Sequence, residues 1–201
     1  MQNKKGLYII LVILSLAGLW LVRFYSLNNY YSQYTDKSYK QYPSNEWIEF
    51  GDDYLDYGVN AKGYLIRIDD FKIIDGKEFV DQIDYCASIS QTIPDKMAII
   101  TISLYNKEST CEGVLLTELS LHGYDSMAHL DWNMLDALNP ILDGNVGIHL
   151  DAGDQCSIVL PYELTEDYYK KSVWENIEYY CFYLRVTEFP MEKDILLTNS
   201  T

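Results

Sequence analysis

Short runs of alternating apolar and polar residues recur along residues 46–197 and are separated by Gly, Asn, Asp and Pro. In the clearest run, Ile100, Ile102 and Leu104 fall on one side of an extended chain, and the residues between them are polar. Alternation of this kind is typical of strands with one buried face. Strands are predicted over Trp47–Phe50, Gly63–Ile74, Met97–Tyr105, Gly113–Leu121, Gly147–Leu150, Cys156–Pro161 and Glu178–Phe189.

Two segments carry helical signals instead. Trp132–Leu138 follows Asp131, a residue type that caps helices, and Glu166–Ile177 follows Thr165 and begins with acidic residues, as the helix dipole favours. A parallel sheet would need a crossover helix between most strands. With so few helices, the pattern predicts a mainly β fold, an antiparallel β-sandwich with one or two short helices.

The N-terminal region has a different pattern. Residues 6–22 are uncharged and mostly apolar, and they lie between Lys5 and Arg23. Extended to Leu27, this run would make about 33 Å of helix, enough to cross a hydrocarbon core of about 30 Å. A single N-terminal transmembrane helix, a signal anchor over residues 6–27, is therefore predicted. A cleaved signal peptide with its cleavage site at residues 15–17 is the alternative.

The basic residues Lys4 and Lys5 indicate the orientation of this anchor, because positive charge favours the cytoplasmic side. The polar, Tyr-rich segment that follows the anchor is interpreted as a stalk. The chain is thus expected to be a single-pass protein of the cell membrane with its C-terminal domain outside. The expected parts are a cytoplasmic N-terminus (1–5), the anchor (6–27), the stalk (28–45), an extracellular β-sandwich domain (46–197) and a tail (198–201).

The composition indicates a folded and strongly acidic body. Hydrophobic residues make up 48% of the chain, enough for a core. The net charge is -15, and residues 28–201 carry 12 basic against 30 acidic side chains, because Lys4, Lys5 and Arg23 precede them. Nucleic acid is excluded as a partner, since neutralising its phosphates requires a basic surface.

Four cysteines fall in the part expected outside the cell, where disulfides persist. Strand alternation places Cys156 and Cys181 on opposite faces, which argues against a disulfide between them. Cys86 and Cys111 lie in predicted loops and could pair. Free thiols are the alternative, because a body of this size is stable without disulfides.

Motifs for catalysis or metal binding are absent from the sequence. No EF-hand spacing is found, and a Ca²⁺ ion would fit best between the loops of Asp143 and Asp151. His122, His129 and His149 lack the spacing of zinc ligands. Nucleophile motifs such as G-x-S-x-G are missing as well. The chain is therefore expected to have no catalytic, cofactor-binding or metal-binding residues.

The nineteen tyrosines are the unusual feature of the composition. Tyrosine favours half-buried strand surfaces, so packing explains many of them. Rigid aromatic rings also provide contact area for a protein partner. A partner-binding patch is predicted around the second helix at Tyr162, Tyr168, Tyr169, Trp174, Tyr179 and Tyr180.

Four segments carry a resemblance to a known family: Trp47–Tyr54, Gly63–Ile68, Leu115–His122 and Thr187–Ile195. In these segments the chain resembles an uncharacterised family of small membrane-anchored proteins of Gram-positive bacteria, a domain of unknown function. The resemblance covers most of residues 46–197. It implies an immunoglobulin-like β-sandwich, and it implies no activity and no catalytic residues.

The function expected from these observations is that of a non-catalytic binding or accessory module outside the membrane, and not an enzyme. The step from a sandwich to binding is an analogy between folds. Two alternatives stay open. One is an exported hydrolase that uses paired carboxylates, and the other is a structural or immunity-like protein that shields a membrane complex.

Overall fold

The computed structural model describes residues 6, 12–26, 38–55, 61–82, 93–108, 113–123 and 125–198. The chain divides into two units, Met1–Lys37 and Ser38–Thr201. In the first unit the described residues 12–26 form a helix with exposed apolar side chains, and the rings of Trp20 and Phe24 stack 5.3 Å apart.

The expected transmembrane helix over residues 6–27 is not found. Within the described part of the chain, no helix is both long enough and apolar enough to cross a membrane. Residues 7–11 and 27 of the predicted anchor lie outside the described residues.

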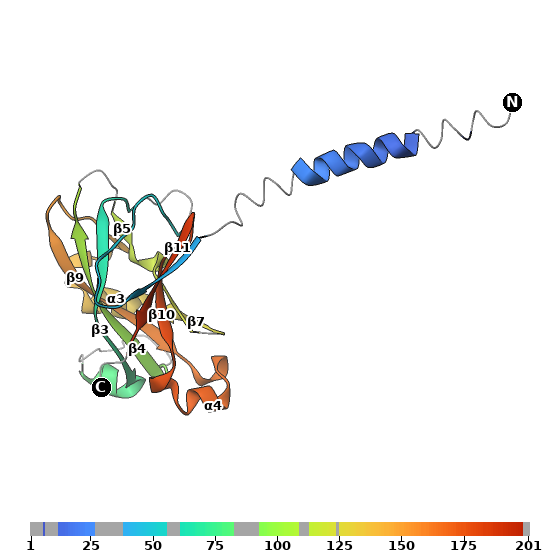
Figure 1. Ribbon diagram of the computed structural model, residues 1–201. Helices are drawn as coiled ribbons and strands as arrows, with labels where there is room; N and C mark the ends of the chain where they lie inside the picture. The colour runs from blue at the N-terminus through green and yellow to red at the C-terminus, as the bar shows by residue number, and fades with distance from the viewer. Residues whose placement is uncertain are drawn as a thin grey trace. The chain divides into compact units, whose positions relative to one another are not determined.

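The second unit is mainly β and is built on one mixed sheet that is nearly closed into a barrel (Figure 1). A short pair, β5 (Val114–Leu115) and β8 (Gly147–Ile148), forms a separate sheet. The nine strands of the main sheet lie in the order β1 (Ser38–Pro43), β11 (Met191–Leu197), β10 (Phe182–Thr187), β6 (Ser120–His122), β7 (Met127–Leu130), β9 (Gln155–Leu164), β4 (Lys96–Asn106), β3 (Tyr64–Asp75) and β2 (Ile48–Glu49).

The helices are short and lie outside or at the ends of the sheet. α2 (Gly76–Gln82) packs beside β3 and β4, and α3 (Trp132–Leu138) packs beside β9. Phe79 of α2 and Met134 of α3 form a buried cluster with Met97 and Ile99 of β4. α4 (Lys171–Trp174) lies at one end of the strands (Figure 1). The remaining helical elements are η1 (Leu116–Glu118), η2 (Pro140–Leu142), η3 (Glu166–Tyr168) and η4 (Ile177–Tyr179).

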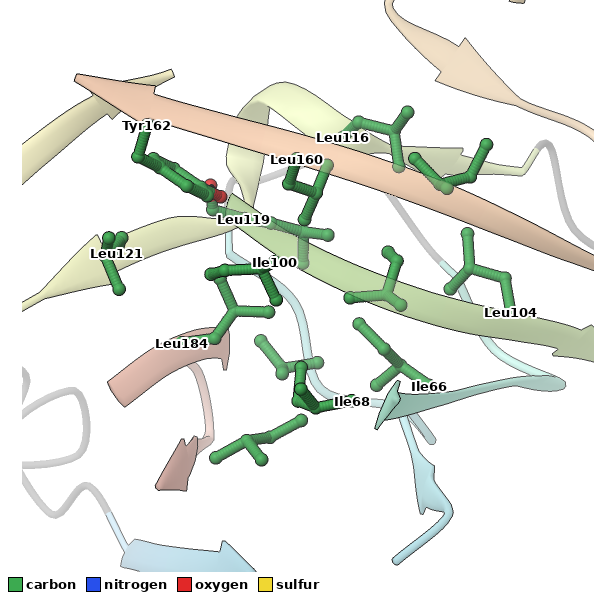
Figure 2. Close-up of a cluster of buried hydrophobic side chains, with 14 of the residues drawn as sticks. Ile66, Ile68, Ile100, Leu104, Leu116, Leu119, Leu121, Leu160, Tyr162 and Leu184 are labelled. Atoms are coloured by element: carbon green, nitrogen blue, oxygen red, sulfur yellow. The ribbon is translucent and has the colours of Figure 1, made fainter. Parts of the chain in front are cut away.

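The core lies on the inner face of the sheet, as the alternation predicts. Ile100, Ile102 and Leu104 of β4 are fully buried, which confirms the expected inward face of that strand. Side chains from strands far apart in the sequence converge in this interior, among them Ile66 of β3, Leu121 of β6, Leu160 of β9 and Leu184 of β10 (Figure 2). Each buried Leu or Ile contributes roughly 2 kcal/mol by leaving water.

The two edges of the sheet meet through a buried lysine. The side chain of Lys193 on β11 is only 8% exposed, and its ammonium lies 2.6 Å from the Asp53 carboxylate. It also donates hydrogen bonds to the backbone oxygens of Glu49, at 2.7 Å, and Phe50, at 2.9 Å. All three N–H donors of the ammonium therefore have acceptors, and these acceptors lie in residues 49–53, at the end of β2 and just after it.

Backbone contacts reinforce this closure at two further points. The amide of Ile68 on β3 donates to the oxygen of Ser44, just after β1, at 3.1 Å. Tyr54 forms an isolated antiparallel bridge with Phe189, and their rings lie 6.2 Å apart. The strands at the two edges, β1 and β2, therefore lie close to each other, and the sheet leaves little of its edges open.

The predicted immunoglobulin-like β-sandwich is thus wrong, although the mainly β class is confirmed. A sandwich has two separate sheets. Here β7 joins what would be the two halves: Leu121 and His122 of β6 pair with its first residues, and its last residues pair with β9. The sheet is also mixed, because β1 runs parallel to β11.

Several predicted elements differ from those observed. Gly113–Leu121, expected as one strand, is broken into β5, η1 and β6, and Leu116 of η1 is buried. Glu166–Ile177, expected as one helix, is split into η3, α4 and the start of η4. Residues 38–43, expected in the stalk, form β1. β7, β11 and α2 were not expected from the pattern.

We predict that Lys193→Met lowers the free energy of unfolding by about 3 kcal/mol, because it leaves the nearly buried carboxylate of Asp53 without its counter-charge and removes a hydrogen bond from the oxygens of Glu49 and Phe50. Urea denaturation followed by circular dichroism measures this. Lys96→Met is the matched control, since Lys96 pairs with the exposed Glu178 and is expected to contribute less than about 1 kcal/mol. Equal effects of the two substitutions would contradict the closing role of Lys193.

Candidate binding face

The helix α3 is fixed at both ends by side chains. At its start, Asp131 accepts hydrogen bonds from the amides of Asn133, at 2.9 Å, and Met134, at 3.0 Å, which confirms Asp131 as the N-cap. At its end, the buried amide group of Asn139 donates to the oxygen of Val159 at 2.8 Å and accepts from its amide at 2.7 Å. Asn139 therefore occupies the edge of β9 where β7 does not pair.

The turn after η2 is held in a fixed shape by another carboxylate. Asp136 accepts a hydrogen bond from the amide of Gly144 at 2.9 Å. Asp143 and Gly144 both have positive φ, of 48° and 76°, which suits an Asp-Gly sequence. This turn holds Ile141 before it and Val146 after it at the surface.

Three adjoining grooves surround these residues. One of about 590 Å³ lies between β5, η2 and β8. A second, of about 420 Å³, lies between α3 and the turn after η2 and shares Asn145 and Val146 with the first. A third, of about 350 Å³, lies beside β6 and β7 and shares Trp132 with the second. We call this surface, whose lining residues all lie between Gly113 and Tyr162, the grooved face.

Large apolar side chains are exposed along the grooved face. Ile141 is 61% exposed, Met127 52%, Trp132 50% and Val146 43%. Single exposed apolar residues are ordinary, but four around adjoining grooves form a patch of the kind that marks interaction sites. Each groove is therefore suited to receive an apolar side chain of a partner protein.

The described residues that line the grooved face include one carboxylate, Asp136, two histidines, His129 and His149, and no Lys or Arg. Between Lys107 and Lys170 the sequence contains no Lys or Arg but has 12 acidic residues and all three histidines. Seven of those acids lie between Gly113 and Tyr162: Glu118, Asp125, Asp131, Asp136, Asp143, Asp151 and Asp154. Of these, Asp136 lines a groove and Asp143 lies in the adjoining turn, so the apolar patch borders negative charge there.

One carboxylate near this face has a shifted pKa. Glu163 on β9 lies opposite His129 of β7. Burial, and after it the nearby Asp131 carboxylate, raises the pKa of Glu163, while His129 acts in the opposite direction. Because Asp131 is the cap of α3, this pair has a structural role and does not open into a groove.

The predicted aromatic patch divides into buried and exposed parts. Tyr162 is fully buried and donates a hydrogen bond to the oxygen of Leu119 at 2.7 Å, so its place in the patch was wrong. Half-buried Tyr169 contacts the rings of Trp174, at 5.7 Å, and Tyr180, at 6.3 Å. Of the six predicted residues, only Tyr168 and Tyr179 are exposed.

These aromatic rings hold the chain between β9 and β10 against the body. Tyr180 packs on Phe182 at 5.1 Å, and its ring fills the space beside Gly123 in the turn between β6 and β7. Burial raises the pKa of Tyr169. Aromatic clusters are thus present, and their ring contacts are internal.

Other histidine and aspartate side chains have ordinary structural surroundings. His122 stacks on Tyr183 at 5.4 Å and lies 2.8 Å from the hydroxyl of Ser120. Asp53 pairs with Lys193, and Asp69 pairs with Arg67 at 2.7 Å. In the part of the chain that the structure describes, no three His, Cys, Asp or Glu side chains are grouped to hold a metal ion.

Two of the four cysteines can be placed. Cys156 and Cys181 are free, so the prediction that they do not pair is confirmed. Burial raises the pKa of the Cys156 thiol to about 11, which makes it a weak nucleophile. Cys86 and Cys111 lie outside the described residues.

The fold and the grooved face define a small mainly β domain with an exposed apolar and acidic surface. Residues 39–193 match the family described as a domain of unknown function, DUF5028, and the chain belongs to this family. The curated proteins and the solved structures that were searched contain no match. The resemblance noted in the sequence is therefore confirmed as an uncharacterised domain family.

Sequence reasoning missed the grooved face. Its apolar residues are spread over α3, η2 and β7, and none belongs to a recognisable motif. One signal was present, the long stretch without Lys or Arg between two basic residues. Such segregation of charge indicates a surface with one sign of potential.

We predict that Asn139→Ala lowers the free energy of unfolding by about 2–4 kcal/mol, because it leaves the buried polar groups of Val159 without partners. It should also loosen η2, which follows Asn139 and carries Ile141, and so raise the rate at which an added protease cleaves there. Asn133→Ala is the control, since Asn133 is exposed, and a change below about 0.5 kcal/mol is expected. Similar losses for both variants would contradict this role of Asn139.

Proposed function

We propose that the body is a non-catalytic binding module that contacts a protein partner through the grooved face. The observation that carries this proposal is the exposure of Met127, Trp132, Ile141 and Val146 around three adjoining grooves. Protein interfaces place large apolar residues at their centre and polar residues at their rim. The acids beside the grooves supply such a rim.

The support for binding is stronger here than at the aromatic cluster. At the cluster, Tyr169, Trp174 and Tyr180 contact one another and the body, which leaves Tyr168 and Tyr179 as isolated exposed rings. At the grooved face, the exposed residues border hollows that can receive a side chain. The cluster therefore supplies a matched set of exposed aromatic controls.

The hydrolase alternative requires two convergent carboxylates in a cleft. Among the described residues that line the three grooves, Asp136 is the single carboxylate, and it accepts the amide of Gly144. This arrangement favours binding over hydrolysis. The shielding role and the location outside the cell stay predictions.

Selection from a displayed random peptide library, with the full chain as bait, tests the proposal. Selected peptides should bind one common surface and compete with one another. Trp132→Ser and Ile141→Ser should each weaken their binding about fivefold or more, as expected for an anchor contact. Tyr168→Ser and Tyr179→Ser should change it less than twofold.

Two results would count against the proposal. One is a selection that enriches no peptide above an unrelated bait. The other is enrichment of peptides whose affinity is unchanged by Trp132→Ser and Ile141→Ser. Sensitivity to Tyr168→Ser or Tyr179→Ser alone would move the binding site to the aromatic cluster.

A further inference from the structure

We infer that the occupant of the grooved face is a cationic peptide segment of a partner protein, one that carries Lys or Arg beside large apolar side chains. This inference rests on the proposed binding function and names the chemistry of the partner. Two independent features of the face lead to it, its exposed apolar residues and its one-signed charge.

In the described part of the chain, the three grooves are lined by one carboxylate, that of Asp136, and by no Lys or Arg. Every lining residue lies between Gly113 and Tyr162, a stretch of the sequence without Lys or Arg. Asp125 reaches Lys170, at 3.7 Å, from outside this stretch. Asp136 and Asp143 lie at the turn between two of the grooves, and Asp136 lines one of them.

A positive partner gains from this field in two ways. It is steered to the face from a distance of about a Debye length, roughly 10 Å at 0.1 M salt. On contact, apolar side chains that enter the grooves displace water around the charge pairs, which lowers the local dielectric constant and strengthens their attraction. Each feature of the face therefore reinforces the other.

The same field argues against the other occupants. A second copy of this body would bring an equally acidic face, and like charges at an interface are costly. Nucleic acid is repelled by the same charges. A small polyamine would satisfy the charge but would leave Trp132, Ile141 and Val146 in water. A peptide that carries both positive charge and large apolar side chains would pair with the carboxylates and also remove Trp132, Ile141 and Val146 from water.

Three synthetic peptides of about 16 residues, long enough for an amphipathic pattern, test the inference against the full chain by fluorescence anisotropy. The first combines Lys with Leu. The second replaces every Lys by Glu and keeps the Leu, and the third keeps the Lys and replaces every Leu by Ser. We expect the Lys–Leu peptide to bind about tenfold or more tightly than either of the others, because it alone matches both features.

Variants of the protein separate the grooved face from general acidity. Asp136→Asn with Asp143→Asn should weaken the Lys–Leu peptide about fivefold, and the loss should shrink when salt rises from about 0.1 M to 1 M. Glu46→Gln with Glu175→Gln removes the same charge from exposed positions that line no groove, and should change binding less than twofold. Ile141→Ser should weaken it at both salt concentrations. Thermal melts establish that each variant is folded.

The outcomes distinguish this inference from the binding function itself. Equal binding of the Lys–Leu and Glu–Leu peptides, both weakened by Ile141→Ser, would overturn the charge requirement and leave the binding module standing. Equal loss with the two pairs of charge variants would also overturn it, because the peptide would then respond to net charge alone. Binding of none of the three peptides would overturn the inference, and the library selection would then decide the proposed function.

Discussion

The fold depends on the contact that joins the two edges of the sheet. The ammonium of Lys193 is nearly buried and binds the carboxylate of Asp53 and the backbone oxygens of Glu49, the last residue of β2, and Phe50, the residue after it. A buried ammonium is costly unless its three donors are satisfied. The segment from Glu49 to Asp53 supplies those acceptors, so the sheet curls until β11 reaches it. Curling encloses the apolar inner face and leaves only the outer face and the loops for function.

Local pattern predicts the parts of this fold that local chemistry decides. Met97–Tyr105 alternates clearly and becomes β4, and Asp131 caps α3 as its residue type favours. The joining of the strands is not local. β7 has four residues and pairs half with β6 and half with β9, and no pattern in so short a segment separates one curled sheet from two packed ones.

The same reasoning explains the errors at the candidate site. Tyr162 was grouped with nearby aromatic residues, yet on β9 it lies on the same face as Ile158 and Leu160, and this face points into the core. The grooved face could not be predicted from motifs, because Trp132, Ile141 and Met127 come from three elements that only the fold brings together. The lack of basic side chains on that face is visible in the sequence as a stretch without Lys or Arg.

Amide hydrogen exchange in the intact protein tests the closure of the sheet most directly. The amide of Ile68 donates to Ser44 across the closing edges, and that of Ile100 lies in the central strand β4. The account predicts that both amides exchange at the same slow rate, which reports global unfolding. Exchange at Ile68 much faster than at Ile100 would show that the edges open on their own, and would contradict a closed and cooperative body.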